Sequence, residues 1–361
     1  MKQHCPLLVS SVVIIATSAM CLFLLSGCAA GLVSSLGGSL PMLGAGTSSA
    51  PNMMERLFVP SDPQLMAEKH FGVKRETVDG IVWRYQGNVL GSTDGVFCSD
   101  PDTIKGNVVI PKTLGGVTIV SLGPHLFMGC ENLASVRIPD CVRTIGNAAF
   151  MGCTSLTTIQ LPQSVTTLGD NVFSGCKSLS SIDFPQGIMT VGKGAFQGCS
   201  GLTSVAIPNG VKVLEDNTFS GCFGLVTVSL PEGLVRIGDS AFHSPLPSQN
   251  CADIRAVKLP STLVTIGESA FNGCSGLTKI VIPDNVTTIG NYAFNDCSSL
   301  KATYIGKKVV RLGTGAFRHT GLTHVYVAEG ASVTLDDLHR AGIAEDCEVY
   351  RIYPDRRTER L

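Results

Sequence analysis

Phenylalanine recurs along this chain with a fixed period, and that period constrains the fold more than any other feature of the sequence. Each phenylalanine of the series follows the previous one by 23 residues, except for one step of 29 residues. The members are Phe127, Phe150, Phe173, Phe196, Phe219, Phe242, Phe271, Phe294 and Phe317. Periods of about 20–50 residues are the signature of solenoids and related folds, in which one structural unit stacks on the next.

The other fixed positions of the unit predict short strands and tight turns. Residues 202–208 (LTSVAIP) alternate apolar with small or polar side chains, the pattern of a half-buried strand. Pro208 is expected to end that strand because proline cannot donate to a strand ladder. Gly146 and its equivalents predict a turn at which glycine permits positive φ. One unit buries almost no surface by itself, so the sequence predicts a mostly β solenoid with irregular turns or short helices.

Cysteine forms a second column in the repeat. It follows the repeat phenylalanine by three residues at Cys130, Cys153, Cys176, Cys199, Cys222, Cys274 and Cys297. Cys251 instead keeps the three-residue spacing to the strand-opening Ile254, which places the extra residues of the long step within 243–250. Because no CxxC pair is present and stacked parallel strands suit disulfides poorly, buried thiols are favoured over a metal or redox site. A Cys98–Cys141 disulfide remains open.

This repeat resembles the BspA-type leucine-rich repeats of bacterial surface proteins over about residues 105–328. Residues 107–111 (NVVIP), followed by 115–123 (GGVTIVSLG), are similar to the usual beginning of such an array. The resemblance implies a right-handed solenoid with a strand sheet on one face and irregular turns on the other. It also implies a role in binding or adhesion, with host matrix proteins or neighbouring cells among the partners of some members. The chain departs from the family pattern in the 29-residue step and at Thr303, where Val or Ile is usual.

The N-terminal residues 1–27 have the pattern of a signal peptide. Lys2 precedes an apolar run over residues 7–25, as in secretory signals. The run ends in Leu25-Ser26-Gly27-Cys28, which resembles the lipobox of bacterial lipoproteins and implies that Cys28 is lipidated. An ordinary signal peptide and an uncleaved membrane helix are the alternatives.

The remaining boundaries follow from composition and from the open ends of the array. Residues 28–52 are rich in Gly, Ser and Ala and are expected to form a flexible tether. Ala29 carries no aspartate retention signal, which by the lipoprotein analogy favours the outer membrane or cell surface. Since a solenoid needs covered ends, residues 53–104 and 329–361 are predicted to be caps around the repeat region 105–328.

Both caps show local patterns. In the N-terminal cap, residues 61–72 predict a short helix, and residues 80–85 and 95–98 predict a hairpin that packs Trp83 over the first coil. In the C-terminal cap, the expected elements are a short helix over residues 333–338, a last strand over residues 347–353 and a frayed tail over residues 355–361.

Composition and motifs argue against several classes of function. The net charge of −1 provides no basic surface for nucleic acid. No HExxH, G-x-S-x-G, P-loop or Rossmann motif is present in the sequence. We therefore predict that the protein is not an enzyme and uses no metal or cofactor.

Strand alternation suggests where a partner would bind. The outward positions of the first strands are small and hydroxylated, whereas those of the later strands carry cations beside exposed aromatic rings, and aromatic rings are favoured at interfaces. The candidate ligand-binding residues are Lys258, Lys279, Tyr304, His324 and Tyr326. An ordinary solvated sheet face is the alternative, and the insertion at 243–250 is a second candidate site.

The predicted function is a lipid-anchored adhesion or binding protein of the bacterial cell envelope, which recognises a protein or glycan through its repeat face. A periplasm-facing structural lipoprotein without an extracellular ligand is the alternative. No nucleic-acid partner is expected.

Overall fold

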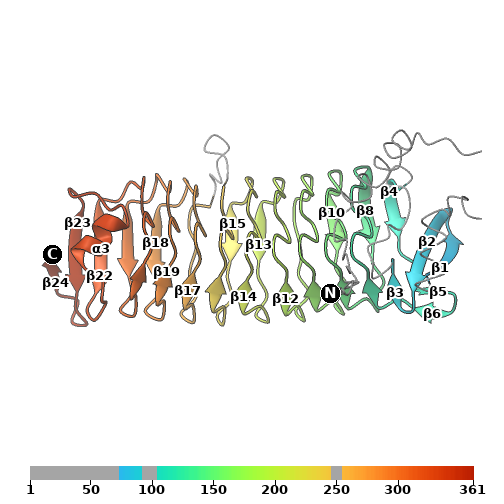
Figure 1. Ribbon diagram of the computed structural model, residues 1–361, viewed down its shortest axis with the longest axis horizontal. Coiled ribbons are helices and arrows are strands. Elements are labelled where there is room, and N and C mark those ends of the chain that lie inside the picture. Colours follow the sequence, from blue (N-terminus) through green and yellow to red (C-terminus); the bar gives the residue numbers. More distant parts are fainter. Residues whose placement is uncertain (1–72, 92–103, 245–253) are drawn as a thin grey trace, which may run out of the picture. The chain divides into compact units, whose positions relative to one another are not determined.

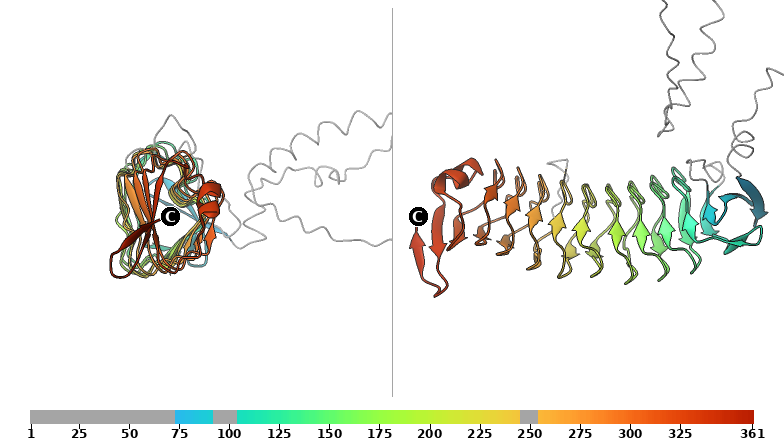
Figure 2. Two further views of the ribbon diagram at one scale, coloured as in Figure 1. Left: turned by 90° about the vertical axis from the view of Figure 1, so that its left-hand side faces the viewer. Right: turned by 60° about the horizontal axis from the view of Figure 1, so that its bottom comes forward.

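Successive repeats form successive coils, which overlie one another when they are viewed along their common axis (Figure 2). The computed structural model describes residues 73–91, 104–244 and 254–361, all within the unit Ser61–Leu361. Two ladders of short parallel strands run along the coils (Figure 1). The prediction of a mostly β solenoid with a 23-residue period is confirmed.

Most strands of the first ladder are those predicted in front of the prolines; the strands at residues 302–305 and 324–328 lack the proline, and residues 358–360 add an antiparallel edge strand. Partners in the regular part lie 23 residues apart, as where Ile159 pairs with Val136 and Val228 with Val205. Two coils contribute only an isolated bridge, at Asp183 and at Ala256. The strands are β4 (Gly106–Val109), β8 (Leu133–Arg137), β10 (Thr158–Gln160), β13 (Ser204–Ala206), β15 (Thr227–Ser229), β18 (Lys279–Ile282), β20 (Ala302–Ile305), β22 (His324–Ala328), β23 (Glu348–Ile352) and β24 (Thr358–Arg360).

A second ladder lies on the side of the coil for which the family resemblance implied irregular turns. The repeat pattern does not predict it, because a two-residue strand is too short to show alternation. Its strands are β7 (Ser121–Leu122), β9 (Thr144–Ile145), β11 (Thr167–Leu168), β12 (Thr190–Val191), β14 (Val213–Leu214), β16 (Arg236–Ile237), β17 (Thr265–Ile266), β19 (Thr288–Ile289) and β21 (Arg311–Leu312). Most adjacent coils are thereby paired at two separate places, although the second ladder is interrupted between β12 and β14.

The repeat phenylalanines stack on one another through the core. Ring centroids of consecutive phenylalanines from Phe127 to Phe317 lie 5.1 to 5.5 Å apart, with interplanar angles of 3° to 25°. Phe242 and Phe271, which flank the long step, keep this spacing at 5.1 Å. The additional residues of that coil therefore leave the core unchanged. All nine rings are fully buried.

A glycine follows each strand of the second ladder except β14, which is followed by Glu215, and it allows adjacent coils to approach closely. The prediction of positive φ at Gly146 is wrong. A Cβ on Gly146 would lie 2.7 Å from the backbone N of Pro124 and 2.8 Å from the carbonyl carbon of Gly123, in the preceding coil. The left-handed residue comes two positions later, at Ala148 with φ of 53°.

The cysteine column is a stack of buried thiols, as predicted. Cys153 Sγ donates to the carbonyl of Phe127 at 3.1 Å, and Cys176 makes the same bond to Phe150. Burial raises the pKa of the Cys153 and Cys176 thiols far above their ordinary range. Of the open pair, Cys141 Sγ donates to the carbonyl of Ile119 at 3.1 Å, and Cys98 lies outside the described residues.

At the N-terminal end, β1 (Lys74–Val78), β2 (Ile81–Gln86) and β3 (Val89–Leu90) are antiparallel neighbours, and β5 (Thr113–Leu114) pairs with β6 (Val117–Thr118). The predicted strand over residues 80–85 is thus present as β2. Its expected partner at 95–98 and the expected helix at 61–72 lie outside the described residues. Trp83 is fully buried and meets Phe127 edge-on at 6.2 Å, which confirms the predicted packing over the first coil.

At the C-terminal end, the predicted helix is present as α3 (Leu335–Arg340). Thr334 caps it, because its side chain accepts a hydrogen bond from Asp337 N at 3.1 Å. The predicted last strand is β23. The prediction of a frayed tail is wrong, since β24 pairs antiparallel with β23, with Arg360 beside Tyr350.

Candidate binding surface on the C-terminal coils

Four of the five predicted ligand-binding residues lie on one five-stranded sheet, whose strand order is β18-β20-β22-β23-β24. Its register places Lys279 in a row with Ala302, His324 and Glu348. A second outward row consists of Val281, Tyr304, Tyr326 and Tyr350, which ends beside Arg360. Lys258 lies one coil earlier, two residues after the bridge between Ala256 and Lys279. The structure therefore brings the predicted residues to neighbouring coils of one face.

Three rings of this face stack on one another. The centroid of Tyr326 lies 6.3 Å from that of His324 and 5.8 Å from that of Tyr350, and the third pair is separated by 6.5 Å. The interplanar angles are 11° to 20°. Because the rings lie face to face along the solenoid axis, they present mainly edges and hydroxyl groups to solvent. All three are partly exposed.

Sequence reasoning missed Tyr350. It was assigned to the terminal cap, where no repeat register relates it to the outward positions of the sheet. The available signal was the alternation of residues 348–352 (EVYRI), which places Glu348 and Tyr350 on the same side of the strand.

Glu348 fixes the geometry of this ring cluster. Its Oε2 accepts a hydrogen bond from the Tyr350 hydroxyl at 2.8 Å and lies 3.3 Å from His324 Nε2. The other imidazole nitrogen of His324 lies 2.9 Å from Thr323 Oγ1. The hydrogen bond to Glu348 raises the pKa of Tyr350, so this hydroxyl is a neutral donor and acceptor over the physiological range.

Tyr304 is oriented by a different carboxylate. Its hydroxyl donates to Asp284 Oδ1 at 3.1 Å, and the backbone N of Lys307 donates to the same oxygen at 3.3 Å. Burial, together with the nearby Asp284 charge, raises the pKa of Tyr304 to about 12. Tyr304 is therefore a half-buried side chain bonded to Asp284, and it is not one of the three stacked rings.

Exposed cations extend the face toward the preceding coils. We call Arg255, Lys258, Lys279 and Lys301 the basic strip; all four are exposed. Lys258 lies 3.7 Å from Glu232, with 90% of its side chain exposed. Within the described ranges, Arg255, Lys279 and Lys301 form no ion pair. Arg255 and Lys301 were not among the predicted site residues, because they lie one position before the alternating part of the strand.

The N-terminal half of the same face has the same backbone lattice and different side chains. Its outward residues are the small or polar Ser135, Thr158, Ser181, Ser204 and Thr227. Arg137, Thr158 and Gln160 line a shallow hollow of about 450 Å³ there. Neither a ring cluster nor a set of neighbouring cations occurs among these positions.

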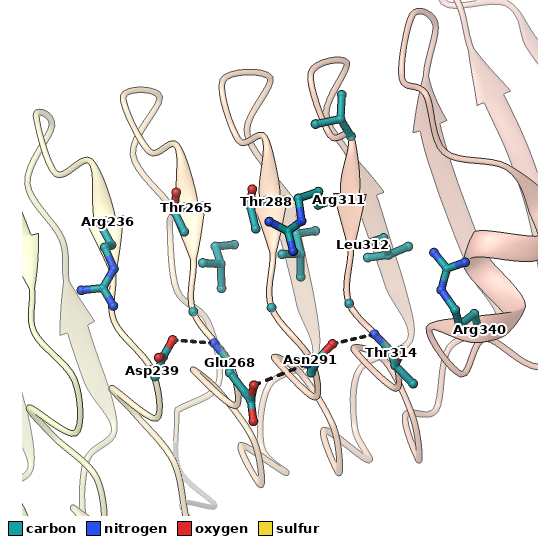
Figure 3. A pocket seen from close by; sticks show the side chains of 16 residues that line it. Arg236, Asp239, Thr265, Glu268, Thr288, Asn291, Arg311, Leu312, Thr314 and Arg340 are labelled. Atoms are coloured by element: carbon teal, nitrogen blue, oxygen red, sulfur yellow. Dashed lines mark hydrogen bonds between the residues drawn. The ribbon is translucent and has the colours of Figure 1, made fainter.

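The second ladder carries a longer groove of about 550 Å³, lined among others by Arg236, Arg311 and Arg340 (Figure 3). Arg311 extends over the strand that carries Thr288 (Figure 3). The other two guanidinium groups are engaged within the protein, Arg236 with Asp216 at 2.8 Å and Arg340 with Asp337 at 2.6 Å.

Polar side chains along one wall of this groove bond to the next coil. Asp239 Oδ1 accepts a hydrogen bond from the backbone N of Glu268 at 2.9 Å, and Asn291 Oδ1 accepts one from the backbone N of Thr314 at 3.0 Å (Figure 3). These groups join coils to one another. The sheet face is therefore the better candidate for binding a partner.

The part of the chain that the structure describes contains neither a cluster of metal ligands nor a helix that could span a membrane. No group of three or more His, Cys, Asp or Glu side chains there could hold a metal ion. None of the helices in these ranges is long and apolar enough to span a membrane. Cys28 and most of the insertion at 243–250 lie outside the described residues; His243, the first residue of the insertion, is within them and accepts a hydrogen bond from Gly221 N through its carbonyl at 2.8 Å.

Comparison with known proteins identifies the repeat. The family model for the BspA type leucine rich repeat region matches residues 120–246 and 249–336, more than half of the chain, with six copies. No curated protein matches the chain significantly.

Several solved structures are similar to this chain. A leucine rich repeat protein of T. pallidum is 26% identical, with 56% of this chain and 91% of that chain covered and a TM-score of 0.40. A leucine rich cell surface protein of Faecalibacterium prausnitzii A2-165 is 21% identical, with coverages of 75% and 98% and a TM-score of 0.36. The pneumococcal vaccine antigen PcpA is 19% identical, with coverages of 77% and 93% and a TM-score of 0.37.

Proposed function

Since this chain belongs to the family of proteins with BspA-type leucine-rich repeats, we propose that it is an adhesion or binding protein of the bacterial cell surface. In this proposal a lipid on Cys28 anchors the chain, and residues 28–52 tether the solenoid to the membrane. The solenoid contacts a protein or glycan of neighbouring cells or of a host matrix. No catalytic step is part of this function.

The stacked ring cluster beside exposed cations is the observation that carries the proposal. His324, Tyr326 and Tyr350 are partly exposed and mutually supported, so they lose little side-chain freedom when a partner binds. Tyrosine is enriched at binding hot spots because it combines a large apolar ring with a hydrogen-bonding hydroxyl. The hydroxylated N-terminal half of the face offers no comparable anchors.

The test uses intact cells that carry the full-length protein. The double variant Tyr326→Ala/Tyr350→Ala is expected to lower cell attachment to matrix-coated or cell-coated surfaces by about tenfold, as for the loss of one hot spot of about 1.4 kcal/mol. The matched control is Ser204→Ala/Thr227→Ala, two exposed positions of the same face, which should attach like the wild type. Cys28→Ala should abolish attachment by releasing the protein from the cell.

Protease treatment of the same cells tests exposure. The proposal requires the solenoid to be cleaved on intact cells. Cleavage only after permeabilisation would contradict the proposal and would favour a periplasm-facing structural lipoprotein. Full attachment by the double tyrosine variant would exclude the ring cluster as the contact.

A further inference from the structure

We infer that the basic strip, Arg255, Lys258, Lys279 and Lys301, binds an anionic polysaccharide that lies along the solenoid axis. This inference rests on the proposed function, since it names the chemistry of the partner for that surface. It concerns the coils that precede the ring cluster, between the bridge at Ala256 and strand β20.

The cations of the strip are available to a ligand. Arg255, Lys279 and Lys301 are exposed and make no ion pair within the part of the chain that the structure describes. Glu232 lies 3.7 Å from a Lys258 side chain that is 90% exposed. A pair as exposed as this holds its lysine weakly. Adjacent unpaired cations repel one another in the free protein, and a bound polyanion relieves that repulsion.

The register of the coils sets the spacing of these charges. Thr278 N donates to the Arg255 carbonyl at 3.2 Å and Lys301 N to the Thr278 carbonyl at 3.1 Å, so Arg255 and Lys301 lie two coils apart in one column. Lys279 lies in the coil between them and in the adjacent column. Arg255, Lys279 and Lys301 therefore supply one cation in each of three successive coils, about 4.8 Å apart along the axis, and Lys258 is a second cation in the first of these coils.

This spacing favours a polysaccharide over an acidic peptide. An extended peptide presents side chains to one face only every second residue, about 6.6 Å apart, and would lose register with the coils. Each pyranose ring advances a glycan by about the same distance as one coil, so sulfate or carboxylate groups on successive sugars can each approach a cation. Lysine, which supplies three of the four cations, is depleted at protein–protein interfaces.

The same lattice without cations occurs in the N-terminal half of the face. Thr157, Ser181 and Thr203 lie in the columns and coil order that Arg255, Lys279 and Lys301 occupy farther along the chain. All three are exposed. The molecule thus contains both the strip and a site at which the strip can be rebuilt.

The experiment measures binding of the purified full-length protein to immobilised heparin, with desulfated heparin and poly-L-glutamate as comparison probes. The triple variant Arg255→Ser/Lys279→Ser/Lys301→Ser is expected to bind heparin about tenfold more weakly, because it loses three screened charge contacts. The control Lys112→Ser/Lys177→Ser/Lys212→Ser removes the same charge at exposed positions elsewhere and should bind like the wild type. Adding Thr157→Arg/Ser181→Lys/Thr203→Lys to the triple variant should restore binding.

Three results would overturn the inference: wild-type heparin binding by the triple variant, equal loss in the control, or poly-L-glutamate binding as tight as heparin binding. The last result would point to an acidic protein as the partner. None of these three results would contradict the proposed function, which is tested separately by the dependence of cell attachment on Tyr326 and Tyr350.

Discussion

At the residue scale, the structure explains why glycine recurs after all but one of the strands of the second ladder. At Gly290 a Cβ would lie 2.5 Å from both the backbone N of Glu268 and the carbonyl carbon of Gly267. Real Cβ atoms do not approach backbone atoms so closely, and the backbone of the preceding coil cannot move without disturbing its own ladder. Glycine is required at position 290 because Gly267 and Glu268, which lie 22 to 23 positions earlier in the chain, are packed against it.

Replacing this glycine by alanine should therefore destabilise the protein. We expect Gly290→Ala to lower the free energy of unfolding by about 1–3 kcal/mol, the usual cost of overpacking. Urea denaturation followed by circular dichroism would measure it. Gly187→Ala is the matched control, because its Cβ would meet no atom closer than 3.8 Å. Equal stabilities of the two variants would contradict the close-approach explanation.

At the scale of an element, the cysteine column links stability to pH. Burial raises the pKa of the Cys153, Cys176 and Cys199 thiols above their ordinary range. Each of them also donates a hydrogen bond to a phenylalanine carbonyl at 3.1 Å, which only the protonated form can do. The folded state therefore prefers neutral thiols more strongly than the unfolded chain does.

Stability should accordingly fall in alkaline solution. Below about pH 8.5 these thiols are protonated in both states, so their contribution is complete. Above that pH the unfolded chain releases protons that the folded chain keeps, and each thiol lowers the free energy of unfolding by about 1.4 kcal/mol per pH unit. Urea titrations between pH 8 and pH 10 would show this slope. Cys176→Ser keeps the donor and does not titrate, so a slope identical to that of the wild type would contradict the prediction.

At the scale of the whole molecule, every coil contacts mainly the coils before and after it. Stability in such a solenoid is a sum of unit and neighbour terms, and a defect weakens the protein locally. Trp83, the only tryptophan, is buried against Phe127 at the N-terminal end of the array. Its fluorescence reports on that end alone, whereas circular dichroism reports on all coils.

Two phenylalanine variants separate local from global unfolding. Phe294→Ala should cost about 3–5 kcal/mol and lower the urea midpoint seen by circular dichroism, while the Trp83 fluorescence midpoint stays unchanged. Phe150→Ala, one ring from Phe127, should lower the fluorescence midpoint. If both variants shift both signals equally, the solenoid unfolds as one unit and the nearest-neighbour description is wrong.

The repeat sequence by itself determined the solenoid, its 23-residue period, the first ladder, the phenylalanine stack and the thiol column. These features repeat, and each contact between coils joins residues of the same type at a fixed separation. A pattern of apolar and polar residues is then sufficient to specify them. For the same reason, strand alternation placed Lys279, Tyr304, His324 and Tyr326 on one face.

Only the tertiary structure decided the second ladder, the role of Gly146 and the complete ring cluster. The two-residue strands and the glycine contact depend on how closely backbones of adjacent coils approach, which no local pattern records. Tyr350 joins Tyr326 and His324 because β23 continues the sheet beyond the last repeat. Outside the repeats no periodicity relates sequence separation to distance in space, so contacts there arise from packing of the whole unit.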